Sequence, residues 1–227
     1  SAAKGESLED TIRTINGYAD GIVLRHPALG AAETAAKVSD IPIINAGDGA
    51  GEHPTQALLD LFTIIEAKGK VNGLKIGLVG DLLNGRTIHS LIYLLGLYKP
   101  EIYCFAPEQL QLPDAYRQQL KADGVTFKTS TKWNHLVSEL DVIYITRVQK
   151  ERFETLEEYE KVKDSLIFDE KILKKAKKDA VIMHPLPRVN EISSEVDSDP
   201  RAIYFEQARN GLFVRMALLD HIFNHKN

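Results

Sequence analysis

Residues 41–80, IPIINAGDGAGEHPTQALLDLFTIIEAKGKVNGLKIGLVG, contain the pattern that decides the fold. IPIIN predicts a strand, residues 54–68 predict a helix with Pro54 early and Gly69 as its stop, and LKIGLVG predicts a buried strand. A strand, a helix and a second apolar strand in this order indicate a parallel β-α-β unit.

The alternation of strand and helix continues on both sides of this unit. Before it, helical patterns at 7–18 and 27–38 flank a β-type run at 21–25. After it, strand patterns occur at 101–106, 125–129, 141–146 and 180–185, and helical patterns at 86–98, 114–124, 133–140, 168–178 and 202–224. This order predicts an α/β fold, in which a mostly parallel sheet carries helices on both faces and the strand ends meet at one rim.

Two of these helices carry expectations of their own. The helix at 54–68 is long enough to bridge two sheets. The last helix has an apolar stripe, most of which we expect to be core: Ile203, Phe205, Leu212, Phe213, Met216, Leu219 and Ile222.

Composition excludes several classes of protein. With 227 residues, 44% of them hydrophobic, and a formal net charge of -4, the chain suits a globular protein and lacks the basic surplus of a nucleic-acid binder. The single cysteine, Cys104, rules out an internal disulfide and predicts a buried, inert thiol. No apolar run is long enough to span a membrane and no secretion signal is present, so we expect a cytosolic protein, or an organellar one whose transit segment has been removed.

An arginine follows each of four predicted strands, in the segments LRH at 24–26, GDLLNGRT at 80–87, TRVQKER at 146–152 and MHPLPR at 183–188. A single arginine in such a place is usually solvated or paired with a carboxylate. Together, Arg25, Arg86, Arg147 and Arg188 would form a cationic pocket, because a guanidinium offers paired donors to carboxylate or phosphate. The sequence therefore predicts anionic ligands.

The histidines also have simpler structural interpretations. His53, which precedes Pro54 at a helix start, could serve only as an N-cap, and its glycine-rich approach could be an ordinary turn. His26 and His184 are interpreted as structural residues. Local sequence leaves the role of His53 open between a structural and a functional one.

The segment GDLLNGRT nearly matches the phosphate-binding loop G-x-x-x-x-G-K-[ST] of nucleotide hydrolases, and it lies between a strand and a helix as that loop does. Arg86 replaces the lysine, however, and no later strand ends in the aspartate expected to help hold magnesium. We interpret the match as a false positive.

Eight segments, in order along the chain, resemble the transcarbamoylase family: KGES at 4–7, LRHP at 24–27, NAGDG at 45–49, HPTQALLDLFTI at 53–64, VGDLLNGRTIHSL at 79–91, TRVQKERF at 146–153, HPLPRVNEI at 184–192 and YFEQARNGLFVRMALL at 204–219. The ornithine branch of that family is expected to carry a cysteine in its HPCQ-like and HCLP-like segments. Thr55 and Pro185 stand in those places here, so the resemblance is to the aspartate branch.

The resemblance implies transfer of a carbamoyl group from carbamoyl phosphate to L-aspartate, giving N-carbamoyl-L-aspartate and phosphate, in pyrimidine synthesis. It implies that Arg25 binds the phosphate and the carbamoyl oxygen, that His53 donates to that oxygen, and that Gln56 meets the carbamoyl amide. Because His53 and Gln56 lie three residues apart at a helix start, both can address one small group.

The aspartate side of the site is implied in the same way. Arg86 and Arg147 would hold the two carboxylates of aspartate, with Gln149 nearby. The backbone carbonyls of Leu186 and Pro187 would face the carbamoyl and amino groups, since proline lacks a competing amide donor. No metal, cofactor or covalent nucleophile is implied.

Lys4 resembles the loop lysine that the family contributes to a neighbouring subunit, which implies a homotrimer with shared sites. The resemblance further implies two doubly wound parallel-sheet domains that close around the substrates. Residues 1–55 and 205–227 would form the carbamoyl phosphate-binding domain, 56–69 the interdomain helix, and 70–204 the aspartate-binding domain.

The chain departs from the family at its N-terminus, because no S-T-R-T-R phosphate-binding segment is present. We therefore expect an N-terminal domain that is incomplete in this chain. A catalytically inactive transcarbamoylase-like regulatory or interaction subunit is the alternative function. The joint presence of His53, Gln56, Arg86, Arg147 and Gln149 argues against it.

Overall fold

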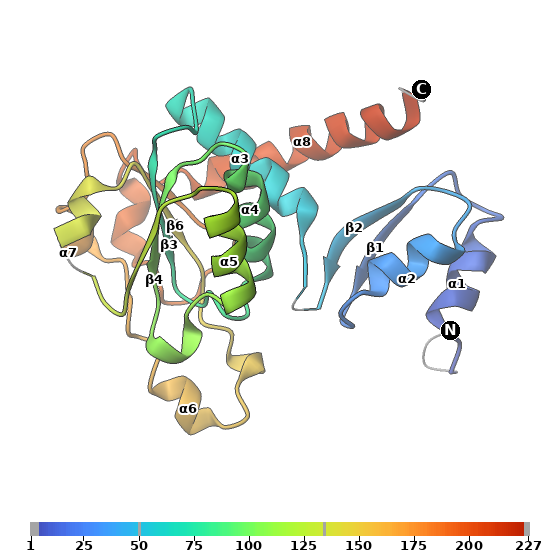
Figure 1. The fold of residues 1–227 in the computed structure, drawn as a ribbon, viewed down its shortest axis with the longest axis horizontal. Coiled ribbons are helices and arrows are strands. Elements are labelled where there is room, and N and C mark those ends of the chain that lie inside the picture. The colour runs from blue at the N-terminus through green and yellow to red at the C-terminus, as the bar shows by residue number, and fades with distance from the viewer. Residues whose placement is uncertain (1–4, 50, 134, 225–227) are drawn as a thin grey trace.

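The computed structural model describes residues 5–49, 51–133 and 135–224. Its strands are β1 (Ile22–His26), β2 (Ile43–Asp48), β3 (Lys75–Val79), β4 (Glu101–Phe105), β5 (Phe127–Ser130), β6 (Val142–Ile145) and β7 (Val181–Met183). Its α-helices are α1 (Leu8–Ile15), α2 (Ala31–Val38), α3 (Pro54–Lys68), α4 (Arg86–Gly96), α5 (Asp114–Ala122), α6 (Leu156–Glu160), α7 (Glu170–Leu173) and α8 (Tyr204–Asn224). Strand and helix alternate along most of the chain, as predicted (Figure 1).

The strands form two parallel sheets. The larger has the order β5-β4-β3-β6-β7, and the smaller pairs β1 with β2. The predicted α/β fold with parallel sheets is therefore confirmed. From β3 the chain runs outward to β4 and β5, then returns to the other side of β3 for β6 and β7. The order of strands reverses between β3 and β6, and α/β sheets of this kind bind ligands at such a reversal.

Both faces of β3, β4, β6 and β7 are buried, which explains why these strands look continuously apolar in the sequence, whereas the edge strand β5 is partly exposed. On one face Leu78 and Tyr144 pack with α3, α4 and α5. On the other, Val79 and Ile143 pack with residues between β6 and α8. Cys104 is 1% exposed, and its burial raises the pKa of the thiol to about 12, so the prediction of a buried, inert thiol is confirmed.

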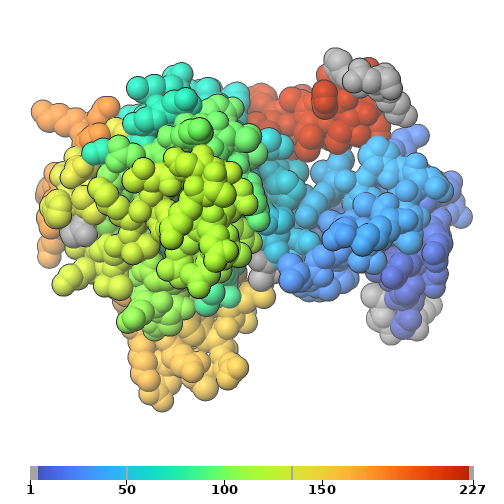
Figure 2. Space-filling view, in the orientation of Figure 1, coloured from blue at the N-terminus to red at the C-terminus, as the bar shows by residue number. Residues whose placement is uncertain are grey.

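The helices α3 and α8 pack against each other beside the larger sheet (Figure 1). Asn210 Nδ2 on α8 donates to Thr63 Oγ1 (3.1 Å) and Glu66 Oε2 (2.7 Å) on α3. The helix α8 then continues toward the smaller sheet, where a Cβ on Gly21 would lie 2.6 Å from Phe223 Cζ (Figures 1 and 2). It therefore spans both parts of the molecule.

The expectation that the apolar stripe of α8 is core is wrong for most of its length. The exposed members are Phe205, Leu212, Phe213, Met216 and Leu219. Tyr204, Gln207, Asn210 and Gly211 are the buried positions of the helix. The helical period identifies residues that share a face, but it does not say whether anything covers that face.

Two further segments differ from expectation. The helix expected at 133–140 is a 3-10 turn at His135–Glu139 among the described residues. The short helix α6 was not predicted, and its N-cap is Thr155, whose Oγ1 accepts from Glu158 N (3.3 Å). Over the described ranges, no helix has the length and apolar character that crossing a membrane requires.

Candidate functional site

A cavity of about 150 Å³ lies at the reversal point of the larger sheet. Its lining comes from β1 (Arg25), the start of α4 (Gly85, Arg86, Thr87), the loop after β6 (Thr146, Arg147, Gln149) and the loop after β7 (His184, Pro185, Leu186, Pro187). Three of the four predicted arginines and Gln149, Leu186 and Pro187 thus meet in one place. The lining also includes Thr87 and Thr146, which the sequence did not single out, although Thr87 directly follows Arg86.

Arg86 is the first residue of α4 and lies against the loop after β2. Its Nη1 donates to the carbonyl oxygen of Gly49 (3.1 Å). A Cβ on Gly47, which has a φ of 118°, would lie 2.9 Å from that same Nη1, so only glycine suits this position. Burial, followed by the charges of Arg25 and Arg152, lowers the pKa of Arg86. Nearby positive charge of this kind favours an anion in the cavity.

Arg147 holds a carboxylate from its own chain. Its Nη1 donates to Glu151 Oε2 (3.1 Å), and its Nη2 pairs with Glu151 Oε1. This hydrogen bond is the first cause of the raised pKa of Arg147. The guanidinium therefore has the forked geometry in which arginine binds a carboxylate.

The loops after β3 and β6 are tied to each other by hydrogen bonds. Gln149 Nε2 donates to the carbonyl oxygen of Asn84 (3.0 Å). Asn84 N in turn donates to Asp81 Oδ1 (2.9 Å), a fully buried carboxylate whose pKa is raised by burial. Asp81 was not predicted as a site residue. Its position inside the GDLLNGRT segment was the one feature of the sequence that could have pointed to it.

The hydrogen bonds of the GDLLNGRT segment, in the loop after β3, exclude its interpretation as the phosphate-binding loop of a nucleotide hydrolase. Such a loop needs free backbone N–H groups pointing at the phosphates. Here the amides of Leu82 and Leu83 both donate to the carbonyl oxygen of Leu110 (3.0 and 3.1 Å), and the amide of Asn84 donates to Asp81. The interpretation of this match as a false positive agrees with the geometry.

His184 supports the loop after β7. Its Nδ1 accepts from Leu186 N (2.8 Å), so Nε2 carries the ring proton toward Glu191 Oε1 (2.7 Å). Glu191 Oε2 accepts from the amides of Val189 and Asn190, both at 3.1 Å. The Leu186–Pro187 peptide bond is cis. His184 thus has the structural role expected of it, and so does His26, whose Nδ1 accepts from Ala28 N (3.0 Å).

His53 occupies the N-cap position of α3, as its simpler interpretation proposed, but its imidazole makes no capping hydrogen bond. Its backbone N donates to Ser90 Oγ on α4 (2.8 Å), which holds the start of α3 in place. Burial, then the charges of Arg86, Arg215 and Arg25, lower the pKa of His53 to about 4. The imidazole is therefore neutral near pH 7 and next to the arginines.

Gln56 is 8% exposed and lies in the first turn of α3, and its Nε2 donates to Asp60 Oδ1 (2.9 Å). Neither His53 nor Gln56 lines the cavity of the three arginines. Lys4, the remaining predicted site residue, lies outside the described residues.

Arg188 does not line the cavity of the other three arginines. The prediction that all four arginines form one pocket is therefore wrong for Arg188. Its guanidinium pairs with both oxygens of Asp197 and donates to the Tyr204 hydroxyl (3.0 Å). It also lies over the rings of Tyr204 and Phe205. Arg188 therefore ties its loop to α8.

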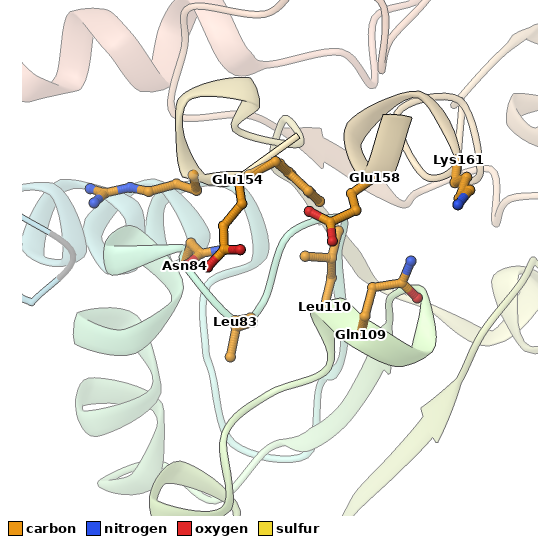
Figure 3. Close-up of a pocket in the computed structure, with 9 residues that line it drawn as sticks. Leu83, Asn84, Gln109, Leu110, Glu154, Glu158 and Lys161 are labelled. Carbon is orange, nitrogen blue, oxygen red and sulfur yellow. The ribbon is translucent and has the colours of Figure 1, made fainter. Parts of the chain in front are cut away.

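A second cavity, of about 410 Å³, is lined in part by Asn84. Glu154 and Glu158 face Leu83 and Leu110 across it (Figure 3). None of the predicted site residues lines it.

Two protein-family models match the chain. Aspartate/ornithine carbamoyltransferase, Asp/Orn binding domain, matches residues 72–222, and aspartate/ornithine carbamoyltransferase, carbamoyl-P binding domain, matches residues 1–66. Aspartate carbamoyltransferase 2, chloroplastic, of Pisum sativum is 55% identical over 221 residues. That match covers 96% of this chain and 57% of the pea protein, so the chain spans less than two thirds of that relative.

Solved structures are similar over nearly the whole chain. The catalytic subunit of M. jannaschii aspartate transcarbamoylase has a TM-score of 0.90 and 50% identity, covering 99% of this chain and 73% of its own. Aspartate transcarbamoylase of Trypanosoma cruzi, described as a complex with N-(phosphonacetyl)-L-aspartic acid, has a TM-score of 0.90 and 44% identity. The match covers 71% of the T. cruzi chain and 96% of this chain.

Proposed function

The chain belongs to the aspartate/ornithine carbamoyltransferase family, and from that premise we propose that the protein carrying it is an aspartate carbamoyltransferase. It would transfer the carbamoyl group of carbamoyl phosphate to L-aspartate, giving N-carbamoyl-L-aspartate and phosphate, in de novo pyrimidine biosynthesis. The observation that carries the proposal is the meeting of Arg25, Arg86 and Arg147 in one cavity. Both substrates are anions, and the T. cruzi relative is described as binding a compound that joins a phosphonate to aspartate.

Aspartate suits this cavity better than ornithine does. An aspartate side chain brings a second carboxylate, which Arg86 or Arg147 can bind with paired hydrogen bonds. Ornithine would instead bring an ammonium group among three guanidinium groups, and unpaired like charges disfavour binding. The carboxylate of Glu151 on Arg147 supports the same assignment, because it occupies the geometry that a substrate carboxylate would take.

On the carbamoyl side, we assign Arg25 to the phosphate and carbamoyl oxygen, His53 to that oxygen and Gln56 to the carbamoyl amide. The amine of aspartate attacks the carbamoyl carbon, so a C–N bond forms and negative charge develops on the carbamoyl oxygen. The C–O bond to phosphate then breaks, and the departing phosphate accepts the proton that the amine loses. Because the pKa of His53 is lowered to about 4, His53 serves as a neutral hydrogen-bond donor to the carbamoyl oxygen. The backbone carbonyls of Leu186 and Pro187 are available to the N–H groups of both substrates.

The wider organisation is proposed from the family. Residues 1–55 and 205–227 belong to the carbamoyl phosphate-binding domain, 56–69 form the interdomain helix, and 70–204 form the aspartate-binding domain. The protein is a homotrimer in which Lys4 completes the site of a neighbouring subunit. Its compartment is the cytosol, or an organelle as in the pea relative, which is named as chloroplastic.

The direct test is carbamoylation of aspartate, with ornithine in parallel, by the full natural polypeptide that carries this sequence. We expect product with aspartate alone. Replacement of Arg147 by Ala should raise the KM for aspartate about ten- to a hundredfold, as loss of a charged hydrogen-bond pair does, and change carbamoyl phosphate binding less than about twofold. Equal losses for the two substrates would count against the assignment, and absence of product from folded protein would favour the inactive alternative.

A further inference from the structure

Asp60 is a fully buried carboxylate, one helical turn after Gln56 on α3, and has no role in the reaction described above. Three side chains donate to it. Gln56 Nε2 (2.9 Å) and Gln207 Nε2 (2.6 Å) donate to Oδ1, and the Tyr144 hydroxyl (2.6 Å) donates to Oδ2. All three donors are themselves buried.

These hydrogen bonds connect three elements of the fold. Gln56 and Asp60 lie on α3, Tyr144 on β6 and Gln207 on α8. Gln207 continues the chain of contacts, because its Oε1 accepts from His184 N (2.8 Å) at the start of the loop after β7. Asp60 thus links the predicted carbamoyl side of the site, on α3, to the loop that carries Leu186 and Pro187.

The Asp60 carboxylate is costly to bury, but it satisfies three buried donors. All its hydrogen-bond partners are neutral, while the charge of Arg215 acts on it without a hydrogen bond, and burial raises the pKa of Asp60 to about 6. An apolar side chain of similar volume would avoid this desolvation, but it would leave the amides of Gln56 and Gln207 and the Tyr144 hydroxyl unpaired. The carboxylate therefore has a role in orienting the groups that donate to it.

The chemistry of Gln56 supplies that role. A carboxamide has a donor end and an acceptor end, and it can rotate by half a turn to exchange them. An ionised carboxylate only accepts, so Asp60 can bind only the NH₂ end of Gln56. The acceptor Oε1 is then directed away from Asp60 and left for another donor.

We propose that Asp60 is a positioning residue, which fixes the Gln56 carboxamide with Oε1 toward the substrate and thereby makes the site select a carbamoyl donor over an acyl donor. This inference rests on the proposed function. The NH₂ group of carbamoyl phosphate is the feature that Oε1 would recognise. Acetyl phosphate has a methyl group in the same place and offers no donor, so it would be bound without help from Gln56.

The test compares the Kd of carbamoyl phosphate and of acetyl phosphate, measured by calorimetry on the full natural polypeptide. Wild-type protein should bind carbamoyl phosphate more tightly; equal binding of the two would overturn the inference, whereas no binding of carbamoyl phosphate would contradict the proposed function itself. Asp60→Leu keeps a similar volume but removes both acceptor oxygens, so the NH₂ end of Gln56 is no longer held and the carboxamide can rotate. It should weaken carbamoyl phosphate about tenfold and acetyl phosphate less than about twofold, the size of one lost hydrogen bond.

Two comparisons separate positioning from general loosening of the fold. Gln56→Met should remove the same selectivity, and adding Asp60→Leu to it should change the ratio of the two Kd values no further. Asn210→Ala, which removes buried hydrogen bonds between α3 and α8 without touching Gln56, should leave that ratio unchanged. Equal weakening of both ligands by Asp60→Leu, with wild-type selectivity intact, would overturn the inference.

A measurement on wild-type protein covers the case in which Asp60→Leu does not fold. Tyr144 from β6 and Arg215 from α8 are the titratable groups that act on Asp60 beside the amides of Gln56 and Gln207. Tyr144 has a pKa raised well above its ordinary value, and arginine stays charged, so Asp60 is the group that titrates near pH 6. The selectivity should fall as the pH drops from about 8 to about 5.5, while titration of the phosphates cancels in the ratio. A ratio that is constant over this range would also overturn the inference.

Discussion

At the scale of single residues, the surroundings decide the chemistry that a side chain can perform. His53 has the sequence position of a helix cap, yet its imidazole caps nothing and lies among three arginine charges. Those charges and burial keep it neutral, which suits a hydrogen-bond donor and not a proton donor. The imidazole therefore has no capping role, and its functional role stays a prediction.

We expect an NMR titration of the His53 ring to show a midpoint near 4, because burial and the charges of Arg86, Arg215 and Arg25 lower its pKa. The pKa in the unfolded chain is about 6.5. Between these values the unfolded chain binds a proton that the folded chain does not, so His53 lowers stability as the pH falls below about 6.5, with the full loss reached below about 4.

Replacement of Arg86 by Ala removes one of these charges and should raise the midpoint of His53 toward its ordinary value. The unaltered protein provides the matched comparison. A midpoint near 6.5 in both proteins would contradict the account of a neutral donor held by its neighbours.

At the scale of elements, the site depends on how two loops are joined. The loop after β3 leads into Arg86 and the loop after β6 carries Arg147, and under the proposed function both must keep their spacing to bind one substrate. Asp81 is the link inside the first loop, and Gln149 connects the loops through the carbonyl oxygen of Asn84. Neither hydrogen bond involves Arg86 or Arg147.

Asp81→Asn should disturb this junction, because the NH₂ group that the substitution introduces would meet the donor groups of Asn84. We expect a loss of about 2 kcal/mol in the free energy of unfolding, measured with urea, as for one buried donor left unpaired. The KM for aspartate should rise, and the Kd of carbamoyl phosphate should change little.

The matched control is Asp114→Asn. Asp114 is an exposed carboxylate paired with Arg117 within the first turns of α5, and such pairs contribute less than about 1 kcal/mol. If both variants lose the same stability, or if Asp81→Asn leaves the KM for aspartate unchanged, the junction does not have the role assigned to it.

At the scale of the whole molecule, α3 and α8 join the parts on which the site depends. They pack together beside the larger sheet, and α8 reaches Gly21 next to the smaller one. Arg25 comes from the smaller sheet and enters the same cavity as Arg86 and Arg147. Relative movement of the two sheets would therefore change the spacing of the arginines.

If the proposed trimer shares its sites, activity should return when two inactive variants of the full polypeptide are mixed and reassembled. Lys4→Ala would be defective in the residue given to a neighbour, and His53→Ala in a residue of its own site. Some mixed trimers would contain one site with both residues intact. The measurement is aspartate carbamoylation before and after mixing.

Two preparations of His53→Ala, mixed in the same way, provide the control and should stay inactive. No recovery from the mixture of the two variants, when exchange of subunits is verified by mass, would contradict shared sites.

Most of the elements and the family relationship follow from the sequence. Local apolar patterns predicted the strands of both sheets, and they are clearest in β3, β4, β6 and β7, because these strands are buried on both faces. The eight family-like segments predicted the transcarbamoylase relationship, which the family models and solved structures confirm. They also singled out Arg25, Arg86 and Arg147 before any geometry was known.

Only the tertiary structure decided which of these residues act together. It separated Arg188, paired with Asp197, from the other three arginines, and it exposed the apolar stripe of α8 that periodicity had suggested was core. The tertiary structure also brings Gln56, Tyr144 and Gln207 together as hydrogen-bond donors to Asp60, although Gln207 lies 147 residues from Asp60 in the chain. The physical reason is that a local pattern records the preference of each segment, whereas the partner of a charge or an apolar face is set by whatever distant segment packs beside it.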